Sequence, residues 1–133
     1  MVESTTQQQI LVLDIGTNSI KAGFAGEISP RCEVPTVLGR SNKNSIMSKV
    51  IKPKPAIGAE ALKNRDILTI KNPIKNGVIE NWEELEEIIH FTCFNELQID
   101  PAECIGVVFT QAPNTSKFVS ERMATILFDL FAA

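Results

Sequence analysis

The stretch DIGTNSIKAGFAG, from Asp14 to Gly26, places a short polar turn between two apolar segments. The apolar segments cover residues 10–14 and 20–25, and turn-forming residues bound each of them. Short apolar runs separated by Gly, Asn and Ser are typical of consecutive strands joined by tight turns. We therefore expect a β-hairpin at this position.

The turn of this hairpin has the residue types of a phosphate-binding loop. Its backbone N–H groups and hydroxyls can point together at an anion, and Gly16 lets the backbone approach closely. Lys21 would return on the second strand as a positive charge, and Asp14 would accept hydrogen bonds from waters around a cation such as Mg²⁺. On composition alone, an ordinary β-turn is the alternative interpretation. Because no helix follows the glycine, the turn is neither a Walker loop nor a dinucleotide-binding fingerprint.

Residues 81–97 form the strongest predicted helix. Asn81 is suited to cap its N-terminus, and Glu84, three residues later, completes a capping-box pattern. The apolar residues at helical spacing should pack on a sheet: Trp82, Leu85, Ile88, Ile89, Cys93 and Leu97. We interpret the glutamates of its first turns as a solvated face rather than as paired catalytic carboxylates.

The remaining segments complete an α/β pattern. Strands are expected at residues 32–38, 67–71 and 104–110, and helices at residues 58–63 and 116–131. The segment 104–110 is continuously apolar, as a strand covered on both faces would be. The last helix should bury a stripe formed by Val119, Met123, Ile126, Leu127 and Leu130. A parallel α/β unit normally continues into another strand after such a helix, so we expect an open sheet edge at the strand 104–110 or its neighbour.

Composition excludes several classes of protein. The chain has 133 residues, 44% of them hydrophobic and 22% charged, with a mean hydropathy of +0.04. These values predict one globular domain, and no apolar run reaches the roughly 18 residues of a membrane span. A net charge of −3 offers no basic field for nucleic acid. The polar first nine residues lack the pattern of a secretory signal, so we expect a cytosolic or nuclear protein.

The cysteines Cys32, Cys93 and Cys104 and the single histidine His90 do not have the spacing of a disulfide framework or of a four-ligand zinc site. We interpret the cysteines as buried reduced thiols. Residues 39–55, GRSNKNSIMSKVIKPKP, have little periodicity and suit an exposed mobile loop. A solvated loop and a partner-binding loop both remain open interpretations.

The hairpin stretch, with Pro30-Arg31 after it, closely resembles the opening of the actin family. Further motifs follow in actin-like order and near-actin spacing: Gly39-Arg40, Gly58-Ala59-Glu60-Ala61, Ile67-Leu68-Thr69-Ile70-Lys71-Asn72-Pro73-Ile74, Gly77, Asn81-Trp82, Asn95-Glu96-Leu97, Pro101 and Thr110-Gln111-Ala112-Pro113. The resemblance extends from about Ile10 to the C-terminus and depends on many motifs in register.

The resemblance implies the α/β fold of the actin, hexokinase and Hsp70 superfamily, in which two lobes close on ATP or ADP with Mg²⁺ and each lobe supplies one phosphate hairpin. It implies that Asp14 faces the water shell of the Mg²⁺ ion. The residues implied to hold the phosphates are Gly16, Thr17, Asn18, Ser19 and Lys21. The second hairpin and the residues that orient the attacking water would lie beyond Ala133. We therefore expect no catalytic residue here, and weak or absent nucleotide binding by the isolated chain.

By the same resemblance the fold is incomplete: an N-terminal half-lobe with a small inserted subdomain. Residues 1–38 and 74–133 would form part of the first subdomain. Residues 39–73 would form the inserted one, with a mobile loop at 41–55. This organisation implies an N-terminal fragment or a truncated product of a longer actin-like protein.

Several positions depart from the actin pattern. Ile15, Thr17 and Asn18 make the turn more like the DIGT form of sugar kinases and Hsp70 proteins than the usual actin DNGSG. Asn76 replaces the histidine that actins commonly carry and often methylate. These differences indicate a divergent actin or an actin-related protein.

Residues 41–50 occupy the position of the DNase-binding loop, which in the family inserts into the next filament subunit. The loop residues are not the actin ones, and Ile46 and Met47 are its apolar anchors.

Three functions follow from these observations. The first is an actin-like cytoskeletal ATP-binding protein of the cytoplasm, whose partners are other actin or actin-like subunits and actin-binding proteins. The second is a sugar-kinase-like phosphotransferase, which the DIGT turn favours but the AGFAG motif and residues 73–77 and 110–113 oppose. The third is a non-catalytic actin-interaction module that binds no nucleotide.

Overall fold

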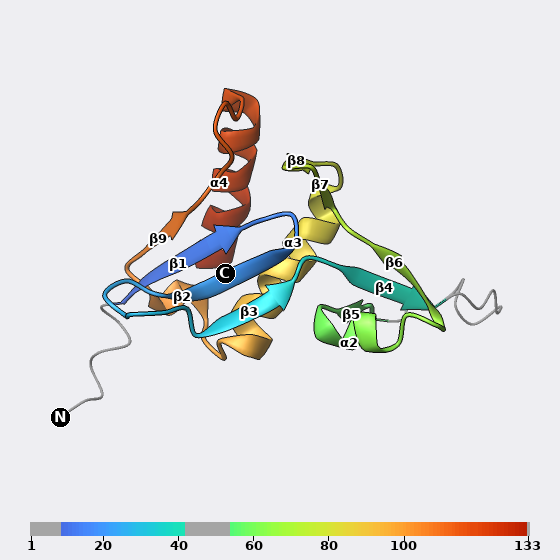
Figure 1. The fold of residues 1–133 in the computed structure, drawn as a ribbon. Coiled ribbons are helices and arrows are strands. Elements are labelled where there is room, and N and C mark those ends of the chain that lie inside the picture. Colours follow the sequence, from blue (N-terminus) through green and yellow to red (C-terminus); the bar gives the residue numbers. More distant parts are fainter. Residues whose placement is uncertain (1–8, 42–53, 133) are drawn as a thin grey trace.

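The computed structural model describes residues 9–41 and 54–132 (Figure 1). The main sheet has four strands in the order β3-β2-β1-β9. Its strands are β1 (Ile10–Ile15), β2 (Ser19–Phe24), β3 (Cys32–Pro35) and β9 (Gly106–Phe109). Strands β1 and β2 are antiparallel, with Asp14 opposite Lys21, whereas β9 runs parallel to β1. The hairpin predicted around residues 14–26 is confirmed.

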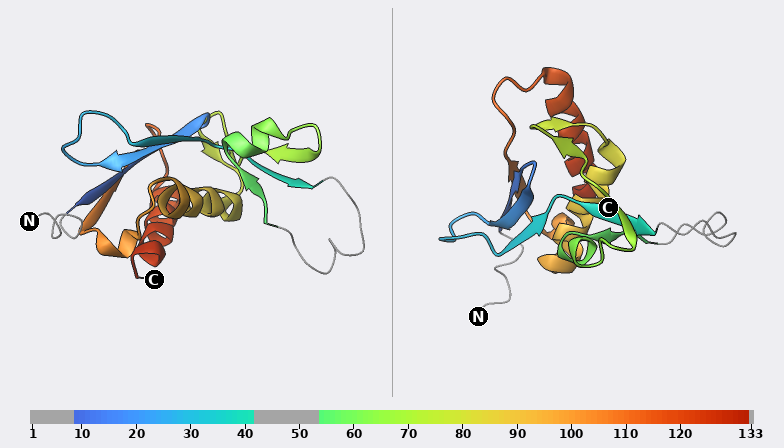
Figure 2. Two further views of the ribbon diagram at one scale, coloured as in Figure 1. Left: turned by 90° about the horizontal axis from the view of Figure 1, so that it is seen from below. Right: turned by 45° about the vertical axis from the view of Figure 1, so that its right-hand side comes forward.

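One face of the main sheet forms the hydrophobic core. Leu11 and Leu13 of β1 are buried with Ile20 and Ala22 of β2, because alternate residues of paired strands point to the same face. The helices are α2 (Ala59–Lys63), α3 (Trp82–Phe91), the π-helix η2 (Thr92–Glu96), the 3-10 helix η3 (Pro101–Glu103) and α4 (Lys117–Ala132). Helices α3 and α4 lie on one side of this sheet (Figure 2), and most of their buried apolar side chains belong to the same core cluster.

A second, three-stranded sheet lies beside the main one in the order β5-β4-β6. Its strands are β4 (Leu38–Ser41), β5 (Ala56–Ile57) and β6 (Leu68–Lys71), and α2 packs near them. Arg40 of β4 forms an ion pair with Glu87 of α3 at 3.0 Å, which connects this sheet to the main body. The predicted strand at 67–71 and short helix at 58–63 are confirmed, whereas β5 was not expected.

The single strand predicted at residues 32–38 is wrong, because the run divides into β3 and β4, which belong to different sheets. The chain turns between them, where the Val37 N–H donates to the carbonyl of Pro35 at 2.8 Å. Pro35 has no N–H with which to continue a ladder. The loop predicted at 41–55, with Ile46 and Met47, lies mostly outside the described residues.

The predicted helix at 81–97 is confirmed as α3 followed by η2. Asn81 caps it as expected, since its Oδ1 accepts a hydrogen bond from the Glu84 N–H at 3.0 Å. The N–H of Asn81 donates to the carbonyl of Pro73 at 3.4 Å. The cap therefore has one half of the expected box, and a contact with the preceding hairpin replaces the other half.

A short hairpin precedes α3 and was not predicted. It consists of β7 (Ile74–Lys75) and β8 (Val78–Ile79), joined by Asn76 and Gly77. Both turn residues have positive φ angles, 53° and 77°. An Asn-Gly pair is the strongest short hairpin signal in a sequence, because a type I′ turn needs positive φ at both central positions.

Strand β9 lies at the edge of the main sheet and, within the described residues, pairs only with β1. Val108 is 54% exposed, so the expectation that residues 104–110 are covered on both faces is wrong for this part of the chain. Continuous apolarity here reflects an edge strand with one uncovered face. The open edge predicted for this strand is present among the described residues.

The helix predicted at residues 116–131 is confirmed as α4. Its stripe packs against the core as expected, with Met123, Ile126, Leu127 and Leu130 buried and Val119 partly buried. Two aromatic side chains of the same helix point away from this core, with Phe118 66% and Phe128 72% exposed.

Candidate functional site

The turn between β1 and β2 is tight. The Gly16 N–H donates to the carbonyl of Ser19 at 3.1 Å and closes the turn. A Cβ atom at Gly16 would lie 3.2 Å from that same carbonyl oxygen. A side chain here would crowd the turn, so glycine favours its tight geometry.

Neighbouring segments hold the carbonyl groups of this turn. The Thr36 hydroxyl donates to the carbonyl of Gly16 at 2.8 Å, and the Thr36 N–H donates to the carbonyl of Asn18 at 3.0 Å. The Asn72 side-chain amide donates to the carbonyl of Thr17 at 2.9 Å. All these acceptors are occupied by groups of the protein itself.

Two N–H groups of the same turn, unlike its carbonyl groups, have no hydrogen-bond partner among the described residues. In the part of the chain that the structure describes, the N–H groups of Thr17 and Asn18 donate to no protein acceptor. A turn with occupied carbonyls and free N–H groups presents positive partial charge to its surroundings. This arrangement suits a phosphate or carboxylate oxygen.

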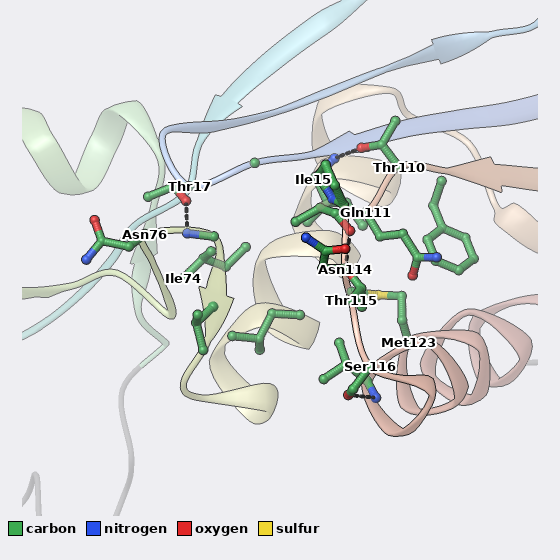
Figure 3. A pocket seen from close by; sticks show the side chains of 18 of the residues that line it. Ile15, Thr17, Ile74, Asn76, Thr110, Gln111, Asn114, Thr115, Ser116 and Met123 are labelled. Atoms are coloured by element: carbon green, nitrogen blue, oxygen red, sulfur yellow. Dashed lines mark hydrogen bonds between the residues drawn. The ribbon is translucent and has the colours of Figure 1, made fainter.

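Asp14 is held by a residue from the far end of the chain. The Thr110 hydroxyl donates to Oδ1 of Asp14 at 2.8 Å. The same hydroxyl accepts a hydrogen bond from the Ile15 N–H at 3.1 Å (Figure 3). The Thr110 N–H donates to the carbonyl of Leu13 at 3.0 Å. These bonds fix the carboxylate of Asp14 at the end of β1.

Lys21 and Ser19 lie on the second strand of the hairpin. Lys21 stands opposite Asp14 on one side and Glu33 on the other, and forms no ion pair with either among the described residues. The Ser19 hydroxyl donates to Oε2 of Glu33 at 2.7 Å, so this hydroxyl already has a partner.

A cavity of about 600 Å³ opens beside the turn. Its walls are the end of β1, the β7–β8 hairpin, residues 109–116 and the start of α4 (Figure 3). The Thr17 hydroxyl accepts a hydrogen bond from the Gly77 N–H at 2.9 Å, which joins the turn to the hairpin. This volume lies in the range of small-molecule sites.

The structure brings only some of the predicted site residues to this cavity. Asp14, Gly16 and Thr17 line it, whereas Asn18 and Ser19 are in the same turn but do not. Lys21 lines a smaller cleft of about 270 Å³, which it shares with Asp14.

The polar part of the cavity wall was not predicted from the sequence. It consists of Asn76, Gln111, Asn114, Thr115 and Ser116. One signal could have found it, because β1 and β9 are parallel and ligands of parallel sheets bind beyond the carboxyl ends of the strands. The polar residues after Phe109 follow such an end.

Among the described residues, Asp14 is the only carboxylate that lines the cavity. Within residues 9–41 and 54–132, no group of three His, Cys, Asp or Glu side chains could hold a metal ion. A hard cation such as Mg²⁺ keeps several waters and takes other ligands from phosphates, so one carboxylate fits a Mg–nucleotide but not a protein-only metal cage.

The three cysteines are free, as predicted, and Cys93 is buried. The prediction of buried thiols is wrong for Cys32 and Cys104, which are only half-buried. Burial raises the pKa of the Cys93 thiol to about 12. Burial also raises the pKa of Cys32 and of Cys104, with nearby carboxylates adding to the effect. These thiols are therefore protonated near neutral pH and are poor nucleophiles.

Comparison with protein-family models matches residues 5–133 to the model described as Actin. The match includes the turn, the β7–β8 hairpin and the polar wall of the cavity. Across the described residues, no helix has the length and apolar character needed to cross a membrane.

Proposed function

Because the chain belongs to the actin family, we propose that the turn between β1 and β2 binds the phosphates of ATP or ADP with Mg²⁺. The mixed α/β structure of the chain is consistent with the N-terminal part of the actin fold. Members of this family typically bind ATP with Mg²⁺. We also propose the finer role that follows from membership. The chain would act as an actin-like cytoskeletal protein, either a filament subunit or an actin-related protein.

The observation that supports phosphate binding is the asymmetry of the turn, whose carbonyls are bonded while the N–H groups of Thr17 and Asn18 are free. In this proposal the backbone from Gly16 to Ser19 faces the phosphates. Lys21 supplies a positive charge, and Asp14 orients water bound to Mg²⁺. The described residues contain one such turn, so we expect a dissociation constant for Mg-ATP of about 1 mM.

Amide chemical shifts test this proposal directly. In a titration of the ¹⁵N-labelled chain with Mg-ATP, the N–H signals of Thr17 and Asn18 should shift first and most, because these donors gain an acceptor. Adenosine and Mg²⁺ alone serve as controls and should leave both signals in place. The proposal fails if adenosine shifts them equally, or if neither moves at about ten times the expected dissociation constant.

The family match bears on the alternatives. Membership of the actin family argues against a sugar-kinase-like phosphotransferase despite the DIGT turn. A non-catalytic actin-interaction module is the second candidate, and the exposure of Phe118 and Phe128 on α4 favours it. The NMR titration separates the two functions, since such a module needs no nucleotide.

The remaining expectations stay proposals for this chain. We propose that residues 39–73 form an inserted subdomain beside a first subdomain of residues 1–38 and 74–133. We also propose that the chain acts in the cytoplasmic cytoskeleton, with other actin or actin-like subunits and actin-binding proteins as partners. No ATP hydrolysis is assigned to this chain.

A further inference from the structure

We propose that the groove between α3 and α4 docks a cationic, amphipathic segment of a partner protein. The groove has a volume of about 410 Å³, and we define it by six of its residues: Trp82, Glu83 and Glu86 of α3 and Phe118, Ile126 and Asp129 of α4. It shares no lining residue with the cavity beside the turn, so the proposal does not depend on nucleotide binding.

The floor of the groove is apolar. Ile126 is buried, whereas the ring of Phe118 is 66% exposed although a soluble helix would place a polar residue at such a position. The Arg122 guanidinium lies over the ring of Trp82, 5.3 Å from its centroid.

The rim of the groove is acidic. Of the described residues, four carboxylates line it, from Glu83, Glu86, Glu121 and Asp129, against one guanidinium, that of Arg122. Lys117 lies 3.8 Å from Glu121 and partly neutralises it. Among the residues that the structure describes, the other three carboxylates form no ion pair.

The apolar and acidic residues of the groove together determine which kind of partner segment can bind there. The excess of carboxylates repels nucleic acid and anionic lipid surfaces and attracts Lys or Arg side chains. The apolar floor requires Leu-like or aromatic side chains on the same face as those cations. A short amphipathic segment of a protein meets both conditions, and a purely polar basic tail does not.

Trp82 makes the test direct, because it is the single tryptophan of the 133-residue chain. The probe is a helical peptide about 14 residues long with Leu at positions i, i+3, i+4 and i+7 and Lys elsewhere. Binding should shift the emission of Trp82 and protect it from acrylamide quenching. The same peptide with Glu in place of Lys should leave the emission unchanged.

Matched variants locate the binding. The double variant Glu83→Gln and Glu86→Gln should weaken peptide binding about fivefold at low salt. The control is the double variant Glu60→Gln and Asp66→Asn, which removes the same charge from a remote exposed surface and should leave binding unchanged. Phe118→Ser should also weaken binding, whereas Phe128→Ser, an equally exposed change outside the groove, should not. All six positions that are changed to test the groove or its controls lie at the surface, so the fold should survive.

Three results would overturn the proposal. One is equal binding of the Lys and Glu peptides, and another is equal weakening by the groove and remote charge variants. The third is a change in Trp82 emission when the protein is concentrated without peptide, provided that the double variant Glu83→Gln and Glu86→Gln removes this change. That last result would assign the groove to a second copy of this chain.

Discussion

The hydroxyl of Thr110 donates a hydrogen bond to the carboxylate of Asp14 at 2.8 Å across 96 positions of sequence. It does so because β1 and β9 are parallel neighbours whose carboxyl ends meet at one edge of the sheet. The same hydroxyl accepts from the Ile15 N–H, so one side chain fixes both the strand end and the acid.

Replacing Thr110 by Val removes both hydrogen bonds while keeping the shape of the side chain. We expect the free energy of unfolding to fall by about 2 kcal/mol, since each of the two hydrogen bonds contributes roughly 1 kcal/mol net. Urea unfolding measures this change. Thr110→Ser keeps the hydroxyl and should restore most of the loss; a Ser variant as unstable as the Val variant would show that the methyl group matters instead.

Lys21→Ala separates a phosphate site from an ordinary turn. If Lys21 faces bound phosphates, the variant should weaken Mg-ATP binding by about 2 kcal/mol, because charge-assisted hydrogen bonds are stronger than neutral ones. Calorimetric titration of the longest available protein that carries this segment is the measurement. Lys63→Ala, on exposed α2, is the control. Lower thermal stability with unchanged nucleotide affinity would mean that the hairpin is only structural.

Local signals predicted the parts of the site that lie close together in sequence. The apolar runs at residues 10–14 and 20–25, with the turn residues between them, predicted the hairpin, and Asn81 predicted the start of α3. The groups that hold the turn could not be predicted this way. Thr36 reaches Gly16 from 20 positions away and Asn72 reaches Thr17 from 55, and these approaches depend on tertiary packing rather than on periodicity.

The errors have physical reasons as well. The run 32–38 is mostly apolar, and its pattern does not show that Thr36 and Val37 turn the chain into another sheet. Burial was overestimated for β9 because an apolar run does not distinguish a central strand from an edge strand. The hairpin at Asn76 and Gly77 could have been predicted from the Asn-Gly pair in the sequence, but it was not.

Gly58 lies between β5 and α2, at a position where a side chain would meet strand β3 of the main sheet. Its φ angle is 69°, and a Cβ atom would lie 2.9 Å from Cγ1 of Val34. Gly26 also has a positive φ, 89°, but a Cβ atom there would meet nothing within 4 Å. Gly26→Ala should therefore cost about 1 kcal/mol from backbone strain alone, and Gly58→Ala about 2 to 4 kcal/mol. Equal losses in thermal or urea unfolding would show that the contact with Val34 relaxes freely.

Cys93 makes stability depend on alkaline pH. Burial raises its pKa from 9.0 to about 12, so the folded chain keeps the thiol protonated where the unfolded chain loses the proton. This contribution is complete below pH 9 and is lost as pH rises toward 12. In that window Cys93→Ala should reduce the slope of unfolding free energy against pH by up to about 1.4 kcal/mol per unit. Identical slopes for the two proteins would mean that the thiol titrates alike in both states.

The uncovered strand β9 should make the chain associate in solution. Within the described residues one side of β9 is unpaired, and Val108 is 54% exposed beside it. Unpaired strands with apolar side chains are templates for pairing with another chain, and a lysine at the edge opposes that pairing. We expect the wild-type chain to elute as associated species in size-exclusion chromatography with light scattering. Val108→Lys should shift the population toward monomer, whereas Val78→Lys, an exposed position in the β7–β8 hairpin, should not. A wild-type monomer with a cooperative thermal transition above about 45 °C would contradict this prediction and show that β9 is a tolerated edge.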